Sequence, residues 1–233
     1  MRINCVNIAD LNNDSFQLLK NAVSEKRRKK ADHLHASDDV KRCICSETLL
    51  RFSLFQEFGE SAEAHIEYNK FGKPFITNME RFFYNISHSG NWVVIAYGNS
   101  EVGIDIEKIQ TGKEIIASRY FTDAEKRYIG EGSYMERAKR FTQIWALKES
   151  YLKYLGTGIS TSLNWFSVDS LQGIVTNQKG EIQEGLKLKS FLFDSDYYLS
   201  VCSIEEEIEL HKFQPEDLVE FVKMMQRSKY DTG

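Results

Sequence analysis

The chain has 233 residues, of which 42% are hydrophobic and 27% are charged, and its formal net charge is -4. This composition is typical of a soluble globular protein with one domain or two small ones, and it provides no overall positive field for binding nucleic acid or a membrane. Long apolar runs are missing, as is an apolar stretch after Met1, so neither a membrane span nor a signal peptide is expected. We therefore expect a cytoplasmic monomer with four reduced cysteines, Cys5, Cys43, Cys45 and Cys202.

The first sixty residues are predicted to form a strand, a basic segment and a helix. Residues 2–8 alternate weakly in hydropathy, as a strand does, and residues 26–30 are all basic. Ser37 is the predicted N-cap of the helix, because two aspartates follow it and acidic side chains are stable in a first turn. Gly59 suits the end of this helix, since glycine readily takes the left-handed conformation.

The middle of the chain is predicted to consist of strands joined by polar loops. A short strand is expected at residues 63–68, and a loop with glycine and proline follows at residues 70–75. Apolar runs at residues 82–86 and 92–97 predict a pair of strands. The small polar residues 87–91 between them predict a turn.

The next part of the chain is expected to begin with a strand at residues 101–107 and to continue with helices. Thr122 and Glu125 have the spacing of a capping box, which predicts the start of a helix. Residues 134–155 carry large apolar side chains near one face and predict a long helix that ends at Gly156.

The remaining chain is β-rich up to residue 204, with a hairpin turn at residues 194–196. A last helix is predicted to begin with Pro215 at its first position, which proline favours. Together these elements predict an α+β protein. We expect two similar α/β subdomains, residues 1–103 and 104–233, that share a sheet edge or a cleft.

Two acidic side chains lie two positions apart in the predicted strand 101–107. Because alternate side chains of a strand share a face, Asp105 and Glu107 point the same way. Neighbouring carboxylates repel each other unless a cation lies between them, and oxygen ligands on a rigid strand suit a hard cation such as Mg²⁺. The alternative is a solvent-facing sheet surface, where neighbouring acids are ordinary, and this segment alone does not decide between the two.

Glu149 and Lys153 lie one helical turn apart in the predicted helix 134–155 and are neighbours on one face. A surface ion pair of little consequence is the simpler interpretation. The large apolar residues around them instead place Glu149 at the edge of an apolar face, where it needs a partner. A metal ion already bound by Asp105 and Glu107 would provide that partner.

Three other features are candidates for binding a phosphate. His88 lies between two serines in the predicted turn, where it binds a phosphate when protonated or simply caps the turn when neutral. Lys73 precedes Pro74 in a loop of restricted shape and can act as a point charge. The basic residues 26–30 are the third candidate, although a charge run is more often a solvated helix face.

Four segments of the chain together resemble the 4′-phosphopantetheinyl transferases, in the two-lobed form that activates nonribosomal peptide synthetases. Gly103–Glu107 is similar to the first hallmark motif of this family, and Trp145–Lys153 is similar to the second. Phe83–Ser89 resembles the family's Phe-Asn-x-Ser-His-Ser segment, and Gly72–Pro74 resembles its Gly-Lys-Pro loop. The order and the separations of the segments also fit, over roughly residues 20–170.

The resemblance implies a role for each candidate side chain. Asp105, Glu107 and Glu149 would hold Mg²⁺, and Glu149 would also take the proton of the attacking hydroxyl. Lys153, the second catalytic residue, would lie beside the pyrophosphate of coenzyme A, and His88 near its 3′-phosphate. The residues implied to bind coenzyme A are Arg27, Lys30, Lys73, Pro74, Ser87, His88 and Lys153.

The activity implied is the Mg²⁺-dependent transfer of 4′-phosphopantetheine from coenzyme A to a serine of an apo acyl or peptidyl carrier protein, with release of 3′,5′-ADP. The fold implied has two α/β lobes related by pseudo-twofold symmetry, with coenzyme A in the cleft between them. Carrier proteins of this type present an acidic helix, and the loop 108–121 is a candidate for docking it through Lys113, Arg119, Tyr120 and Phe121. In the alternative interpretation, the aromatic residues of this loop pack inward.

Two other functions would use the same residues. A Mg²⁺-dependent phosphodiesterase or pyrophosphatase would employ the same acids with water as the nucleophile, and it would release 3′,5′-ADP without a carrier protein. A nucleotide- or carrier-binding module with an inactive site is the non-enzymatic alternative. The complete set of acids, together with Lys153, argues against the latter.

Overall fold

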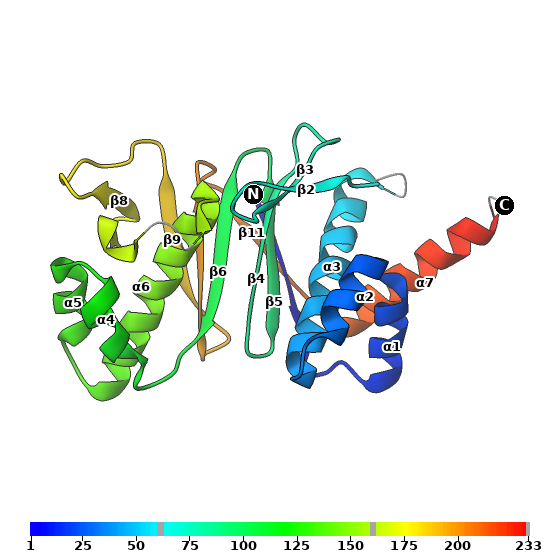
Figure 1. Cartoon of the computed structure of the whole chain (residues 1–233), viewed down its shortest axis with the longest axis horizontal. Helices are drawn as coiled ribbons and strands as arrows, with labels where there is room; N and C mark the ends of the chain where they lie inside the picture. The colour runs from blue at the N-terminus through cyan, green and yellow to red at the C-terminus, as the bar shows by residue number, and fades with distance from the viewer. Residues whose placement is uncertain (60–62, 159–161, 232–233) are drawn as a thin grey trace. The chain divides into compact units, whose positions relative to one another are not determined.

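The computed structural model describes residues 1–59, 63–158 and 162–231 (Figure 1). The chain forms two compact units. Unit 1 comprises Met1, His65–Ser87 and Ala96–Ile208, and unit 2 comprises Arg2–Ala64, His88–Ile95 and Glu209–Gly233. Each unit is thus built from separate stretches of chain. Residues 103 and 104, between which we expected the boundary of two subdomains, lie in a strand of unit 1, β6 (Val102–Lys108).

Unit 2 combines helices with a parallel pair of strands. Its helices are α1 (Asn13–Ala22), α2 (Glu25–Asp32), α3 (Ser37–Phe58) and α7 (Pro215–Asp231). The predicted first strand is confirmed as β1 (Arg2–Asn7), which pairs in parallel with β11 (Glu209–Phe213). Apolar rings join the helices to the strands, since Phe52 of α3 lies 4.9 Å from Phe213 and 5.5 Å from Phe221 between ring centroids.

The long helix of unit 2 begins one residue earlier than the sequence suggested. Ser37 is the first helical residue and Ala36 occupies the cap position, without a side-chain cap hydrogen bond. The Ser37 hydroxyl instead lies beside the Asp38 carboxylate. The end at Gly59 is confirmed, with a φ angle of 80°.

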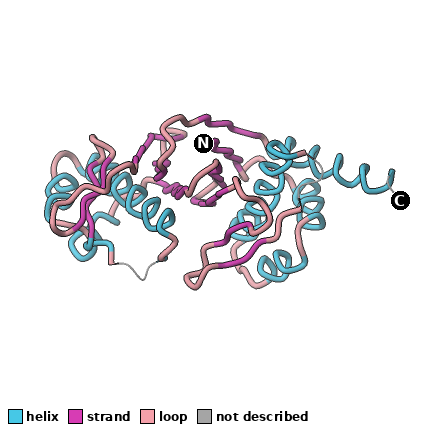
Figure 2. Tube along the Cα trace, turned by 90° about the horizontal axis from the view of Figure 1, so that it is seen from above, coloured by secondary structure: helices cyan, strands magenta, loops and turns pink. Residues whose placement is uncertain are grey.

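Unit 1 places helices against a three-stranded antiparallel sheet. The sheet has the order β6-β10-β9, where β9 is Lys187–Phe193 and β10 is Tyr197–Ser203. The short helices α4 (Ala117–Tyr120) and α5 (Asp123–Gly130) lie with α6 (Tyr134–Leu155) on one side of this sheet (Figures 1 and 2). The described residues of this unit also form β2 (Ile66–Tyr68), β3 (Pro74–Ile76), η1 (Lys113–Ile116), η3 (Leu163–Trp165), β7 (Phe166–Asp169) and β8 (Ile174–Asn177).

The strands β4 (Phe83–Ser89) and β5 (Trp92–Gly98) each have residues in both units. The sheet that contains them has the order β11-β1-β5-β4. The predicted turn at residues 87–91 is wrong in part, because the strand continues through Ser87, His88 and Ser89. Only Gly90 and Asn91 connect the strands, and Gly90 has a φ angle of 53°, which suits a tight hairpin.

The predicted ends of the unit 1 helices are confirmed. Thr122 and Glu125 form a capping box at the start of α5. Helix α6 has the predicted bounds, and Gly156 ends it in the left-handed conformation with a φ angle of 66°. The turn at residues 194–196 is also confirmed by positive φ angles at Asp194 and Ser195. No helix in the described part of the chain is long and apolar enough to cross a membrane.

Candidate active site

Gly103 allows β6 and α6 to approach each other closely. A Cβ atom at this position would lie 2.0 Å from the carbonyl oxygen of Ser150 and 2.4 Å from the backbone nitrogen of Tyr154. Both atoms belong to the backbone of α6 and cannot move aside, so only glycine fits here. The side chains that follow Gly103 on the strand therefore meet those of the last turns of the helix.

Two polar side chains of β4 satisfy the free edge of β6. Strand β10 pairs with one edge of β6, and the backbone amides of Ile104 and Ile106 on the other edge need acceptors. Asn85 Oδ1 accepts from Ile104 N at 3.2 Å, and Ser87 Oγ accepts from Ile106 N at 3.3 Å. The alternation of Asn85 and Ser87 along β4 thus matches the period of the strand that they cap.

Asp105 lies at the centre of a charged cluster within unit 1. Asp105 is only 4% exposed, and its Oδ1 accepts hydrogen bonds from Ser87 Oγ at 2.8 Å and from Lys153 Nζ at 2.6 Å. Lys153 Nζ also donates to Ser87 Oγ at 2.8 Å. Within the described residues, Oδ2 of Asp105 is buried without any hydrogen-bond partner. Such an atom is costly unless a further donor or cation meets it.

Glu149 lies one turn before Lys153 and is electrostatically coupled to the same cluster. Burial raises the pKa of its carboxyl group, the negative charge of Asp105 raises it further, and Lys153 opposes both effects. A carboxylate with a raised pKa is a stronger proton acceptor. The simple surface ion pair between Glu149 and Lys153 is not the main contact here, because Lys153 binds Asp105.

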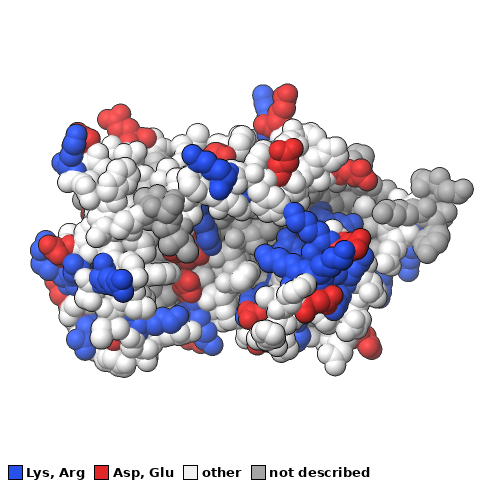
Figure 3. Space-filling view, in the orientation of Figure 1, with Lys and Arg blue, Asp and Glu red and all other residues white. Residues whose placement is uncertain are grey.

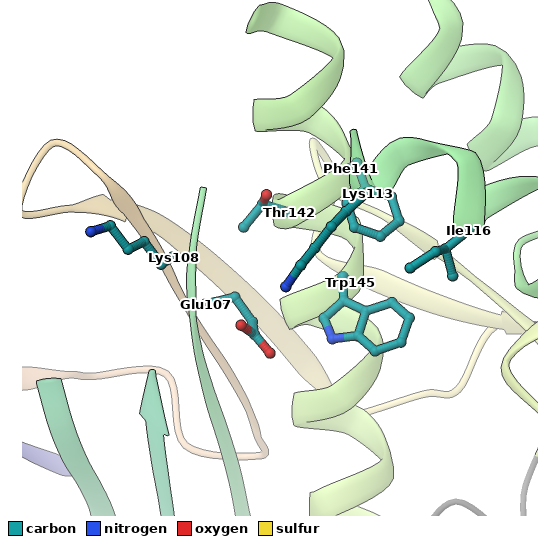
Figure 4. Close-up of a pocket in the computed structure, with 7 residues that line it drawn as sticks. All are labelled: Glu107, Lys108, Lys113, Ile116, Phe141, Thr142 and Trp145. Carbon is teal, nitrogen blue, oxygen red and sulfur yellow. The ribbon is translucent and has the colours of Figure 1, made fainter. Parts of the chain in front are cut away.

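Glu107 lies at the wall of a pocket of about 120 Å³ (Figure 4). Lys113 extends from η1 into this pocket toward Glu107 and Trp145 (Figure 4). Ile116 and Phe141 make the opposite wall apolar. The pocket therefore offers the Glu107 carboxylate, the Lys113 ammonium group and an apolar surface side by side.

The three predicted metal ligands are not assembled into one ready cluster. No group of three or more His, Cys, Asp or Glu side chains is placed to hold a metal ion in the part of the chain that the structure describes. Asp105 and Glu149 are nevertheless close enough for their charges to interact. The buried, unpartnered Oδ2 of Asp105 is an oxygen ligand of the kind that Mg²⁺ prefers, so these two residues fit such an ion.

Lys73 lies at the C-terminal end of α6, where it contacts the protein itself. Its Nζ donates to the carbonyl oxygen of Tyr154 at 3.0 Å and to Glu101 at 2.7 Å. A cation at this end of a helix is favoured by the helix dipole. Pro74 is the first residue of β3. The side chain of Lys73 is 13% exposed, so the structure gives it a capping role that the sequence did not suggest.

The predicted coenzyme A-binding residues of unit 2 are more exposed. Basic side chains gather over α2 (Figure 3). Lys30 of this helix is exposed. His88 is an exposed residue of β4. Arg27 is half-buried, and its Nε donates to Glu47 at 3.2 Å while its Nη1 lies 3.9 Å from the Cys43 sulfur. Cys5, Cys43, Cys45 and Cys202 are free and buried.

Lys148, which directly precedes Glu149 in the chain, is a buried lysine to which the sequence assigned no role. Lys148 is 0% exposed and forms an ion pair with Glu125 at 2.8 Å. Its Nζ also donates to the carbonyl oxygens of Leu163 at 2.8 Å and Phe166 at 2.6 Å. Burial lowers the pKa of this ammonium group and Glu125 counteracts that shift. The network fixes α6 to α5 and to the start of β7.

The loop 108–121 contains both exposed and buried aromatic residues. Phe121 is 1% exposed and stacks on Phe141 with a centroid distance of 5.6 Å, so it packs inward. Tyr120 is 38% exposed, and Arg119 lies over its ring. The segment contains the short helices η1 and α4, so it is an ordered surface with Lys113 in the pocket.

Comparison with known proteins identifies the family. Residues 11–100 match the sequence model described as 4′-phosphopantetheinyl transferase, N-terminal, and residues 101–202 match that of the 4′-phosphopantetheinyl transferase superfamily. A 4′-phosphopantetheinyl transferase of Bacillus subtilis is 31% identical over 184 residues, which are 78% of this chain and 82% of the relative.

Two further relatives agree with this match. The 4′-phosphopantetheinyl transferase Sfp of Bacillus subtilis strain 168 is 29% identical over 84% of this chain and 86% of its own length. The 4′-phosphopantetheinyl transferase gsp of Aneurinibacillus migulanus is 30% identical over 81% of this chain and 79% of its own length. The chain therefore belongs to the 4′-phosphopantetheinyl transferases and is an enzyme of that class.

Proposed function

We propose that this enzyme transfers 4′-phosphopantetheine from coenzyme A to a serine of an apo acyl or peptidyl carrier protein, with release of 3′,5′-ADP and in dependence on Mg²⁺. The membership of the family supports the reaction class. The observation that carries the proposal is the cluster in which the Asp105 carboxylate, the Lys153 ammonium group and the Ser87 hydroxyl meet next to Glu149. The cluster combines an oxygen ligand for a cation, a positive charge and a proton acceptor.

The bonds that change define what the site must do. The serine Oγ attacks the phosphorus that bears pantetheine, and the bond from this phosphorus to the oxygen of the 5′-phosphate of 3′,5′-ADP breaks. Negative charge grows on the leaving phosphate, and the serine loses its proton. The site must therefore supply positive charge at the diphosphate and an acceptor for one proton.

Asp105, Glu107 and Glu149 are the residues that would hold Mg²⁺. Bound there, the ion would neutralise charge on the two linked phosphates. Asp105 is fixed on β6 by the hydrogen bonds to Ser87 and Lys153, so its buried Oδ2 is held in place for a ligand. Glu107 is the more accessible acid of the strand, at the wall of the pocket.

Glu149 and Lys153 are the proposed catalytic residues. Glu149 would accept the serine proton on its carboxylate, which lies close enough to Asp105 for the two charges to interact. Lys153 carries a positive charge on a long side chain that is 28% exposed, and it would stabilise the oxygen between the phosphates as the bond breaks. Ser87 supports Lys153 as a hydrogen-bond acceptor.

Other side chains would bind the parts of coenzyme A that do not react. The proposed set consists of Arg27, Lys30, Lys73, Pro74, Ser87 and His88, with His88 near the 3′-phosphate. The exposed position of Lys30 and His88 suits a charged ligand that arrives from solvent. For Lys73, the proposal adds ligand binding to the contacts that it already makes with Glu101 and Tyr154.

The carrier protein would dock on the surface formed by the 108–121 segment. Lys113 in the pocket and Arg119 on α4 supply positive charge for an acidic helix, and the exposed ring of Tyr120 supplies apolar area. The pocket wall formed by Glu107 places this surface next to a proposed metal ligand. The acceptor serine would thus arrive beside the groups that act on it.

The test is a transfer assay read by mass spectrometry. The protein is mixed with coenzyme A, Mg²⁺ and a panel of apo carrier proteins, and each carrier is then weighed. We expect the mass of one phosphopantetheine to be added to a carrier, and the addition to stop when EDTA removes the metal. Transfer that is undiminished in EDTA would contradict the Mg²⁺ dependence.

A parallel mixture without a carrier separates transfer from hydrolysis. A transferase leaves coenzyme A intact under these conditions, whereas a hydrolase releases 3′,5′-ADP rapidly. Release of 3′,5′-ADP at the same rate with and without a carrier would refute the proposed acceptor. Binding of coenzyme A without any product in either mixture would refute the reaction itself.

A further inference from the structure

Glu47 of α3 is a nearly buried carboxylate that fixes the start of the basic helix α2. Its Oε1 accepts a hydrogen bond from the backbone nitrogen of Ser24 at 2.6 Å, and its Oε2 accepts from the Ser24 hydroxyl at 2.8 Å. Ser24 is the N-cap of α2, and its Oγ in turn accepts from the backbone nitrogen of Arg27. A negative charge at this end of a helix is favoured by the exposed amides and the helix dipole.

The same carboxylate determines the direction of the Arg27 side chain. Oε2 of Glu47 accepts from Nε of Arg27 at 3.2 Å, and the side chains of Arg27 and Glu47 are 22% and 11% exposed. Nη1 of Arg27 lies 3.9 Å from the Cys43 sulfur. In the described part of the chain Nη2 has no hydrogen-bond partner. Because the guanidinium group is planar and rigid, fixing its Nε fixes the direction of its other N–H groups.

We propose that Glu47 is a positioning residue for coenzyme A, because it orients Arg27 so that the terminal N–H groups face a phosphate of the ligand. This inference rests on the proposed function and goes beyond it, since Glu47 itself does not touch the ligand. The carboxylate of Glu47 is occupied by Ser24 and Arg27, so an incoming phosphate meets the cation and not the acid. A lysine at position 27 would supply charge without this directed planar edge.

Arg28, the next residue of α2, has a purely structural role. Nη1 of Arg28 donates to the carbonyl oxygens of Asn21 at 3.1 Å and Val23 at 2.8 Å, so its side chain closes the turn between α1 and α2. Arg27 makes its contacts to a carboxylate and a sulfur and keeps donors available. The two arginines therefore have different predicted effects on ligand binding.

The experiment measures the KM for coenzyme A and kcat in the transfer assay for the wild type, Glu47→Gln, Arg27→Ala and the double variant. We expect Glu47→Gln to raise the KM roughly tenfold, the effect of misdirecting one charge-assisted hydrogen bond, with kcat within about twofold of the wild type. Arg27→Ala should raise the KM at least as much. The double variant should be no worse than Arg27→Ala alone, because Glu47 acts only through Arg27.

Ser24→Ala is the matched control for a general loosening of α2. It removes the hydroxyl contact to Glu47 and the N-cap, and it leaves the contact between Glu47 and Arg27. It should lower the thermal unfolding midpoint and keep the KM within about twofold. A KM raised by Ser24→Ala as much as by Glu47→Gln would assign the effect to helix placement and overturn the inference.

Several outcomes contradict the inference without touching the proposed function. These are an unchanged KM in Glu47→Gln, a fall in kcat alone, or KM effects of Glu47→Gln and Arg27→Ala that multiply in the double variant. A wild-type protein that transfers no phosphopantetheine would instead refute the function before any variant is compared. If Glu47→Gln does not fold, Arg27→Lys decides, because an unchanged KM in this variant excludes a need for the directed guanidinium edge.

Discussion

The two units hold their candidate functional side chains in different ways. In unit 1 the Asp105 carboxylate is 4% exposed and is held by a lysine and a serine, next to a second acid with a raised pKa. In unit 2 Lys30 and His88 are exposed, and Arg27 is directed by one carboxylate. Groups that act on the reacting bond need fixed positions, whereas groups that bind distant phosphates can remain solvated. We therefore expect variants of the unit 1 cluster to lower kcat, and variants of the residues that bind distant phosphates to raise the KM for coenzyme A.

The largest effect is expected at the centre of the unit 1 cluster. Asp105→Ala removes the buried carboxylate that Lys153 and Ser87 fix, and it should lower the transfer rate by about 10²–10³-fold or more. The chain should stay folded, because Lys153 is 28% exposed and can be solvated. Initial rates and circular dichroism measure the two properties.

Asp196→Ala is the control for Asp105→Ala, since Asp196 is exposed in a turn of the same unit. It should retain the wild-type rate. Normal metal-dependent transfer by Asp105→Ala would refute the assignment of this carboxylate to the active site.

The next effect is on stability and concerns the network beside the cluster. Lys148→Met leaves the buried Glu125 without its cation and should lower the free energy of unfolding by about 3–5 kcal/mol. Urea denaturation measures this change. Lys126→Met is the control, because Lys126 forms a surface pair with Asp123 at 3.1 Å, and it should change stability by less than about 1 kcal/mol. Equal losses of unfolding free energy in the two variants would show that the buried pair contributes no more to stability than the surface pair.

A smaller loss of stability is expected at the contact between β6 and α6. Gly103→Ala places a methyl group within 2.0 Å of the Ser150 carbonyl oxygen, so the strand and the helix must separate. Overpacking of this kind should lower the free energy of unfolding by about 1–3 kcal/mol, and transfer should fall because Asp105 moves away from Lys153.

Gly130→Ala tests the specificity of this effect. A Cβ at Gly130 would meet no described atom within 4 Å, and the residue lies in α5. This variant should be as stable as the wild type or slightly more stable. An intact transfer rate in Gly103→Ala would mean that the close approach of β6 and α6 does not position the site.

The smallest effect is expected at Lys73, which tests the division between the two kinds of residue. Lys73→Met should raise the KM for coenzyme A several-fold with little change in kcat. Glu101→Gln is the control, because it removes the ion-pair partner at 2.7 Å and keeps the lysine. Its KM should match the wild type. If both variants merely lower stability by a similar small amount, Lys73 serves only as the cap of α6.

The sequence predicted those parts of the fold that depend on local chemistry. The bounds of α6, its end at Gly156 and the capping box of Thr122 and Glu125 follow from neighbouring residues, and all three are confirmed. Residues 87–89 were wrongly assigned to the turn, because small polar residues also occur in a strand when their side chains bind backbone amides. Ser87 does so by accepting from Ile106 N.

The contacts between distant elements could not be predicted from the sequence pattern. Lys148 follows Phe141 and Ile144 at helical spacing, so its position on the apolar face of α6 was a readable sign of burial. Its partner Glu125 was already explained as a capping residue, and the same carboxyl group performs both tasks. Likewise, the sequence suggested that Lys153 pairs with Glu149, and nothing in it indicated that Lys153 instead binds Asp105. That contact depends on the packing at Gly103.

The cooperation of strand and helix carboxylates is tested most directly by a double-mutant cycle of Asp105→Asn and Glu149→Gln, measured as initial rates of carrier modification with coenzyme A and Mg²⁺. Residues that act as one unit lose most of their effect once either is removed. We therefore predict that the double variant is about as slow as the slower single variant. Rate losses that multiply in the double variant would contradict a shared site for Asp105 and Glu149.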